Sequence, residues 1–266
     1  MAWYAFLVSF REFLEIALIL GLLLAGLAHW GGGEGRGYVW SGALGAIFLS
    51  AVLWVLLSDF LGSLQGPILS LFEGLMMLLA AGILTYCIFW MRRQAFFRRL
   101  EGKVRAAVRA GGWGLFLLAF SLVVREGLEL VIFLRAGLSL ASSTWGYVTA
   151  ALAGGAVAVV AGALVYVGSL RLPVRTFFRV TGAVLIFFAA GLLSNAIHEW
   201  REGGWLGGEG LWDTSGYLSE SSRWGAFLHT LLGYDPEPTL LQVAVYLSYL
   251  VLALFLYFRR LSPDRT

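Results

Sequence analysis

The sequence predicts an all-α integral membrane protein with seven transmembrane helices, built as two inverted three-helix repeats plus one extra C-terminal helix. Three observations lead to this prediction. Of the 266 residues, 59% are hydrophobic and only 13% are charged, which suits helices surrounded by lipid and leaves too few polar residues for a water-exposed surface. The apolar residues form runs of about 20, the length that crosses about 30 Å of hydrocarbon. Two of these runs also share one charged motif.

Seven apolar runs are long enough to span a membrane. The first is interrupted by Arg11, Glu12 and Glu15 and has no basic segment before it. We therefore expect it to be kept as a membrane span and not removed as a signal peptide. All seven belong to a single transmembrane domain covering 1–266. The predicted spans are residues 3–28, 38–60, 67–91, 113–137, 146–169, 177–200 and 239–258.

The connections between the runs alternate in charge. Residues 92–111 contain seven basic side chains against one acid, Glu101, and the positive-inside rule places this connection in the cytoplasm. Counting spans outward predicts an outside N-terminus and a cytoplasmic C-terminus in the cytoplasmic (inner) membrane. The pI of 9.2 therefore reflects loop charge and does not indicate a nucleic-acid partner. The other basic residues on the cytoplasmic side are Arg36, Arg171, Arg175, Arg179, Arg259, Arg260 and Arg265.

The connection from 201 to 238 lies outside the membrane in this topology and is rich in glycine, tryptophan and acids. It can be interpreted as a solvated loop that rests partly on the membrane interface, or as a mouth that attracts cations. The sequence does not separate these two interpretations. Its acidic residues are Glu202, Glu209, Asp213, Glu220, Asp235 and Glu237.

The first three spans are repeated in the next three. AFLVSFREFLEIALIL from Ala5 matches AFSLVVREGLELVIFL from Ala119, and GYVWSGALGA from Gly37 matches GYVTAALAGG from Gly146. Because three spans is an odd number, the second copy must be inverted, a plan that places a transporter's substrate site near the midplane. The predicted divisions are repeat one (1–91), a basic cytoplasmic loop (92–111), repeat two (112–200), an acidic outside loop (201–238), and the seventh helix with its tail (239–266).

Each repeat carries an Arg-Glu-x-x-Glu motif in its first span. Residues i, i+1 and i+4 lie at about 0°, 100° and 40° around a helix axis, so the three charged side chains share one face. The two glutamates of a motif are one turn apart, close enough to address a single ion. The six motif residues are Arg11, Glu12, Glu15, Arg125, Glu126 and Glu129.

Six charged side chains inside predicted spans need a functional explanation, because each costs about 2.5–3.5 kcal/mol near the centre of an inserted helix. A purely structural alternative pairs each arginine with the glutamate four residues later, but it leaves Glu12 and Glu126 without a cation. Four glutamates with no His or Cys at these positions form an all-oxygen site, which favours hard cations such as Fe(III), Ca, Mg or Mn. The arginines would reduce the charge of the empty site from about −4 to −2.

REFLE at Arg11 and REGLE at Arg125 resemble the paired signature of the oxidase-dependent high-affinity iron permease family of microbes. The resemblance covers nearly the whole chain: seven spans, motifs in the first and fourth, and an outside loop before the last. It implies import of Fe(III), or of iron delivered by an oxidising partner such as a multicopper oxidase or an extracytoplasmic accessory protein, with no permanently bound cofactor. The metal ligands that it implies are Glu12, Glu15, Glu126 and Glu129, supported by Arg11 and Arg125.

Five further residues are secondary candidates for the ion's route. Glu73 opens the third span and is similar to an acid in this span of the family; we expect either a ligand on the way in or an ordinary helix-end acid. His198 and Glu199 close the sixth span, where a solvated helix end is the alternative to a metal relay. Asp235 and Glu237 lie in GYDPEP, which resembles a family feature ahead of the last span.

Two other positions bear on the site. Phe13 stands where the family often has glycine, whereas Gly127 keeps that residue, so we expect Phe13 to narrow the first half of the site. Cys87 lies within an apolar run and is expected to serve packing, because a single cysteine supplies neither a disulfide framework nor a thiolate site of the usual kind.

Two alternative functions remain. One is a permease for another divalent metal, such as manganese or lead, which the same oxygen ligands would accept. The other is a membrane-embedded carboxylate metalloenzyme; di-iron bundles, however, use Glu-x-x-His on two helices, and no histidine follows Glu12 or Glu126 at that spacing. In the preferred interpretation the protein is a transporter without enzyme activity, and its partners are the iron ion and membrane lipid. The formation of homo-oligomers is left open.

Overall fold

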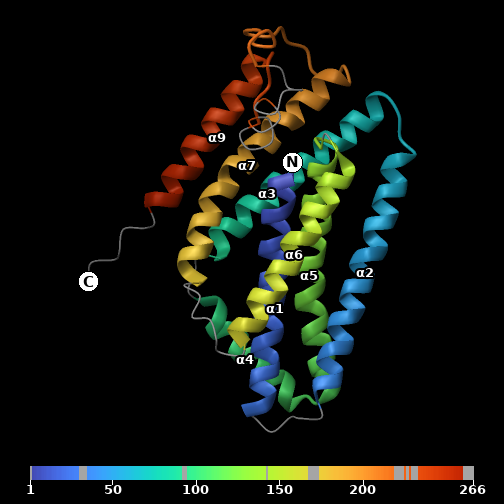
Figure 1. Ribbon diagram of the computed structural model, residues 1–266, viewed down its shortest axis with the longest axis vertical. Helices are drawn as coiled ribbons and strands as arrows, with labels where there is room; N and C mark the ends of the chain where they lie inside the picture. Colours follow the sequence, from blue (N-terminus) through green and yellow to red (C-terminus); the bar gives the residue numbers. More distant parts are fainter. Residues whose placement is uncertain are drawn as a thin grey trace.

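The computed structural model describes residues 2–29, 35–91, 95–141, 143–166, 174–218, 225, 228 and 233–259. Within these residues the regular structure is helical, apart from an isolated antiparallel bridge between Gly210 and Thr239. The helices pack side by side in an elongated bundle (Figure 1). They are α1 (Ala2–His29), α2 (Arg36–Gly62), α3 (Pro67–Met91), α4 (Ala95–Arg109), α5 (Gly112–Leu138), α6 (Thr144–Tyr166), α7 (Val174–Glu202) and α9 (Leu240–Arg259).

Each predicted span coincides with a long helix, with ends that agree within three residues. Five of the described helices have the length and hydropathy of a membrane span: α2, α3, α6, α9 and the Thr181–Glu202 part of α7. α1 and α5 are not among these five, but they are equally long, at 28 and 27 residues, and they carry the two charged motifs. The protein is therefore an all-helical, multi-pass membrane protein.

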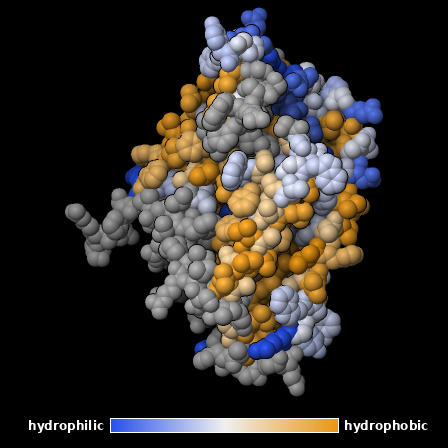
Figure 2. Space-filling model, viewed as in Figure 1, coloured by the Kyte–Doolittle hydropathy of each residue, from blue (hydrophilic) through white to orange (hydrophobic). Residues whose placement is uncertain are grey.

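The surface of the bundle fits a lipid environment. Large apolar side chains such as Phe48, Leu152, Leu247 and Val251 are more than half exposed, which a water-exposed domain rarely allows over whole helices. Figure 2 shows hydrophobic residues over the middle of the visible face, with hydrophilic residues gathered toward its upper end. The outward faces of the long helices thus provide the lipid-facing surface that the composition predicts.

The basic connection after α3 contains a helix, α4, that the charge count alone did not reveal. Val104 and Ala107 are buried one turn apart, while Lys103 and Arg109 are exposed. This is an amphipathic pattern, and its apolar side packs against α5 and α1. The connection therefore forms a cap on one end of the bundle instead of a simple loop. Arg92, Arg93, Arg171, Arg260 and Arg265, which contributed to the predicted topology, lie outside the described residues.

The helices pack in reciprocal pairs. α1 packs chiefly against α6, α2 against α5 and α3 against α7, while α9 packs against α7 and α1 also contacts α5. Glycines allow the first two pairs to approach closely. A Cβ atom on Gly154 of α6 would lie 2.2 Å from the carbonyl oxygen of Phe6, and one on Gly42 of α2 would lie 2.5 Å from that of Phe116. Small residues at such contacts let helix backbones pack tightly in membranes.

Two apolar clusters occupy the interior, and along α1 and α5 one lies on each side of the charged motif. Along α1, Val8 belongs to the first cluster and Ile16 to the second. Along α5 the order is reversed, because Val123 belongs to the second cluster and Phe133 to the first. α1 and α5 are therefore antiparallel, and the charged motif of each helix lies between the two clusters.

Candidate metal centre

The charged motifs lie in the middle of α1 and α5, where these two helices contact each other. Glu12 is fully buried, and Glu15, Glu126 and Glu129 are each less than 9% exposed. Because these carboxylates are buried, they depend on the arginines or on an ion to compensate their charge. The helical spacing predicted one charged face on each helix, and in the structure these two faces lie close to each other.

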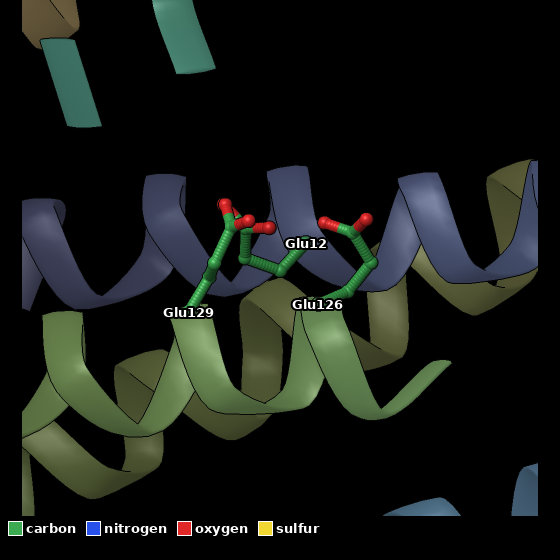
Figure 3. Close-up of side chains that lie close together, drawn as sticks. All are labelled: Glu12, Glu126 and Glu129. Atoms are coloured by element: carbon green, nitrogen blue, oxygen red, sulfur yellow. The ribbon is translucent and has the colours of Figure 1, made fainter. Parts of the chain in front are cut away.

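Three of the four predicted carboxylates converge on one point. Glu12 from α1 and Glu126 and Glu129 from α5 each offer an oxygen, and these three oxygens lie within 4.8 Å of one another. Figure 3 shows the side chains of Glu126 and Glu129 extending from α5 toward Glu12 on α1. Glu15, one turn further along α1, is not part of this triangle, but its charge interacts with that of Glu129.

The arginines bind the glutamates in part as predicted. Arg11 Nε is 3.1 Å from Glu15 Oε1 and Arg125 Nε is 3.0 Å from Glu129 Oε1, the expected pairs four residues apart. The expectation that such pairing leaves Glu12 without a cation is wrong, because Arg11 Nη1 also donates to Glu12 Oε1 at 2.7 Å. A guanidinium has donors on several nitrogens, and Arg11 uses two of them to hold both glutamates of its motif.

Three carboxylate oxygens at the centre have no hydrogen-bond partner among the described residues. They are Glu12 Oε2, Glu15 Oε1 and Glu126 Oε2, all buried. Buried polar atoms are nearly always paired, and a buried unpaired oxygen costs about 1–3 kcal/mol. Oxygens that lack a donor and lie in a cluster of net negative charge are suited to receive a cation.

Cys87 is the site residue that the sequence analysis did not recognise. It lies on α3, is 1% exposed, and its thiol donates to Glu129 Oε2 at 2.8 Å. Its burial agrees with the expected packing role, and the hydrogen bond adds a contact with the carboxylate centre that the sequence did not indicate. Only the contact of α3 with α5 reveals the pair, since 42 residues separate it in the sequence.

The two halves of the centre are not equivalent. The side chain of Arg11 is 3% exposed, whereas that of Arg125 is 36% exposed. Gly127 leaves room for Ser50 of α2, whose Oγ would lie 2.1 Å from an added Cβ, while the ring of Phe13 packs 3.1 Å from the Cβ position of Gly155 in α6. The ring of Phe13 on α1 thus packs into the space that Gly155 leaves on α6.

A second group of polar residues lies where α7 ends and the 203–239 segment returns to α9. His198 Nδ1 lies 2.7 Å from Asp235 Oδ2, and Gln242 Nε2 donates to the same oxygen at 2.9 Å. The backbone N–H of Glu237 donates to the other oxygen, Oδ1, at 2.9 Å. Burial alone would raise the pKa of Asp235, but these hydrogen bonds outweigh it and hold the pKa well below its usual value. Asp235 therefore anchors the segment to α7.

The other secondary candidates are dispersed around this anchor. Glu199 is partly buried, and its charge interacts with those of Glu73 on α3 and Glu202 on α7. Glu202 also lies 3.3 Å from His198 Nε2. The Glu237 side chain is exposed, and its backbone carbonyl accepts a hydrogen bond from Arg201. These acids make one end of the α3–α7 pair negative.

Replacing Asp235 with Asn should loosen the 203–239 segment. The change puts an amide donor where the aspartate has only acceptors, so at least one of its three hydrogen bonds is lost at a cost of about 1–3 kcal/mol. Limited proteolysis of the segment should then be about tenfold faster or more. Asp213→Asn is the matched control, because Asp213 is exposed and its hydrogen-bond partner among the described residues is the nearby Ser215. Equal cleavage rates in the two variants would refute the anchoring role.

A multi-pass helical membrane protein with buried carboxylates converging from two antiparallel helices has the arrangement expected of a metal-ion transporter. The profile of the iron permease FTR1 family matches residues 3–261. The chain belongs to the iron permease FTR1 family. It is an iron permease, a membrane transporter and not an enzyme, which removes the metalloenzyme alternative.

Two relatives are similar to this chain over nearly its whole length. The ferrous iron permease EfeU of Yersinia pestis is 36% identical over 268 residues, which cover 98% of this chain and 94% of the relative. The ferrous iron permease EfeU of Escherichia coli strain 536 is also 36% identical, over 262 residues that cover 94% of this chain and 92% of the relative. No solved structure is a significant match.

Proposed function

We propose that the chain imports iron across the cytoplasmic membrane through Glu12, Glu15, Glu126 and Glu129, with Arg11 and Arg125 as supporting residues. The observation that carries this proposal is the convergence of oxygens from Glu12, Glu126 and Glu129 within 4.8 Å. Glu15 joins when the ion draws it away from Arg11, whose Nε is its nearest ion-pair partner. The arginines keep the empty cluster from accumulating four uncompensated negative charges.

The architecture that supports this function is a pair of inverted repeats. In this proposal α1, α2 and α3 form repeat one, α5, α6 and α7 form repeat two, and α9 is the seventh span. The reciprocal packing of α1 on α6 and of α2 on α5 supports it, because exchanging the repeats turns each pair into the other. The antiparallel α1 and α5 then contribute equivalent ligands to a site near the midplane.

The ion's route follows from the acids at one end and the basic residues at the other. The end that carries Glu73, Glu199 and Glu202 faces outside and concentrates cations near the bundle. The end capped by the basic helix α4 faces the cytoplasm, with the N-terminus outside and the C-terminus inside. Because apolar clusters close both ends of the centre, transport requires the repeats to rearrange and to open the site to one side at a time.

The external form of the ion is proposed to be Fe(II). The relatives named above are ferrous iron permeases, and a divalent ion needs less negative charge than Fe(III) to be held and released. The second candidate is Fe(III) produced at the membrane by an oxidising partner, which an all-carboxylate set of ligands favours.

Uptake of radioactive iron by vesicles reconstituted with the purified protein tests both candidates. Iron kept reduced with ascorbate should enter protein-containing vesicles and not empty ones, and an impermeant Fe(II) chelator should stop it. Ferric citrate without reductant should enter poorly. Uptake of neither form would refute the proposed function, and faster uptake of the ferric form would favour the second candidate.

Competition among metals separates an iron permease from a broader metal permease. Manganese and lead, added singly in tenfold excess over Fe(II), should reduce iron uptake only where they share the carboxylate site. Vesicles that accumulate manganese or lead faster than iron would identify one of those ions as the preferred substrate.

A further inference from the structure

The centre contains one soft ligand atom among its hard ones. Cys87 Sγ lies 2.8 Å from Glu129 Oε2, while Arg125 binds the other oxygen of the same carboxylate. The sulfur and Arg125 therefore contact different oxygens of the Glu129 carboxylate. Glu129 in turn belongs to the oxygen triangle with Glu12 and Glu126. Cys87 therefore contacts one member of the triangle through Glu129, while its sulfur is not itself within 4.8 Å of all three oxygens.

A second observation indicates that this point is meant for a ligand. Glu12 Oε2 and Glu126 Oε2 are buried and have no hydrogen-bond partner among the described residues. The surroundings of Cys87 are thus unlike an ordinary apolar packing site, where a thiol contacts hydrocarbon. Here the thiol donates a weak hydrogen bond to Glu129, and the neighbouring oxygens Glu12 Oε2 and Glu126 Oε2 have no donor among the described residues.

Ligand softness determines which cations such a mixed set prefers. Carboxylates alone accept Ca and Mg as readily as transition metals, whereas a sulfur ligand favours softer and borderline ions and is a poor ligand for Ca and Mg. Calcium and magnesium are common ions outside cells, so an iron permease with only carboxylates would need another means to reject them.

We propose that Cys87 is a specificity-determining ligand, whose sulfur joins Glu12, Glu126 and Glu129 around a divalent transition-metal ion and selects it against Ca and Mg. This inference rests on the proposed function of the carboxylate centre. The ion takes the place of the thiol proton, which is released on binding, as for other cysteine ligands. The hydrogen bond to Glu129 holds the sulfur in position until the ion arrives.

Cadmium is the probe, because it is divalent, soft and gives an ultraviolet absorption band when it binds a cysteine sulfur. The chain contains one cysteine, so any such band in the purified protein reports on Cys87 alone. We expect Cd²⁺ titration to produce the band in the wild-type protein. Cys87→Ser keeps the size and a hydrogen-bond donor, and should abolish the band. Glu129→Gln should weaken it, because that variant removes the neighbouring carboxylate.

Transport supplies the second readout. Cys87→Ser should raise the Cd²⁺ concentration that half-inhibits iron uptake by about tenfold or more, and should increase inhibition by Ca²⁺. Wild-type protein without a cadmium–sulfur band, or equal Cd²⁺ inhibition of wild type and Cys87→Ser, would overturn the inference. Wild-type vesicles that take up no iron would instead refute the proposed function, and the absorption titration would still determine whether Cys87 is a ligand.

Discussion

Iron uptake by a Glu126→Gln variant should fall to that of vesicles without protein. Glutamine keeps the shape of the side chain but removes the charge of a carboxylate whose Oε2 is buried and unpaired. Loss of residues that only support metal ligands lowers affinity 10- to 100-fold, so loss of a ligand should reduce uptake by about 100-fold or more. The ion pairs of the described motif residues involve Glu12, Glu15 and Glu129, so the variant should remain folded.

Glu209→Gln is the matched control for this experiment. It makes the same chemical change at an exposed position between α7 and α9, and its uptake should stay near that of the wild type. Thermal unfolding in detergent checks that both variants are folded. If Glu126→Gln transports iron within about twofold of the wild type, the carboxylate centre is not the transport site.

Arg11→Met should prevent stable folding, whereas Arg125→Met should have a much smaller effect. Arg11 is almost completely buried and binds both Glu12 and Glu15, so its removal leaves two carboxylates without their cation. Breaking a buried ion pair by removing one partner costs about 3–5 kcal/mol, a large share of the 5–15 kcal/mol that stabilises a typical protein. Arg125 is 36% exposed and binds Glu129, whose other oxygen also accepts from the Cys87 thiol, so this carboxylate keeps one of its donors when Arg125 is removed.

The yield of folded protein after membrane extraction and gel filtration measures this difference. Adding Glu12→Gln and Glu15→Gln to Arg11→Met should restore folding, because the uncompensated charges are then gone, but it should not restore iron uptake. Equal yields of Arg11→Met and Arg125→Met would contradict the asymmetry of the two motifs.

The spans were predictable from the sequence because lipid imposes simple requirements on length and hydropathy. The predicted ends agree with the helices within three residues. The meeting of the two motifs was predicted from the repeated charged motif, because an inverted repeat, as proposed here, would direct equivalent residues to a shared centre. α4 was not predicted as a helix because its charge, which determined its predicted side of the membrane, obscured an apolar stripe of Val104 and Ala107.

Contacts between distant segments were beyond the reach of sequence patterns. Cys87 and Glu129 meet because α3 packs against α5, and His198 and Asp235 meet because residues 233–239 lie against α7. No local spacing encodes either pair. The double role of Arg11 was missed for a different reason: the rule for residues four apart describes where Cβ atoms point, not how a long guanidinium group distributes its donors.

The most direct test of the carboxylate centre is a structure of the protein with Fe(II), or with Mn(II) as its stand-in, located by anomalous scattering. The account predicts one ion between α1 and α5, bound by oxygens of Glu12, Glu126 and Glu129. An ion found elsewhere, with these three carboxylates unoccupied, would contradict it.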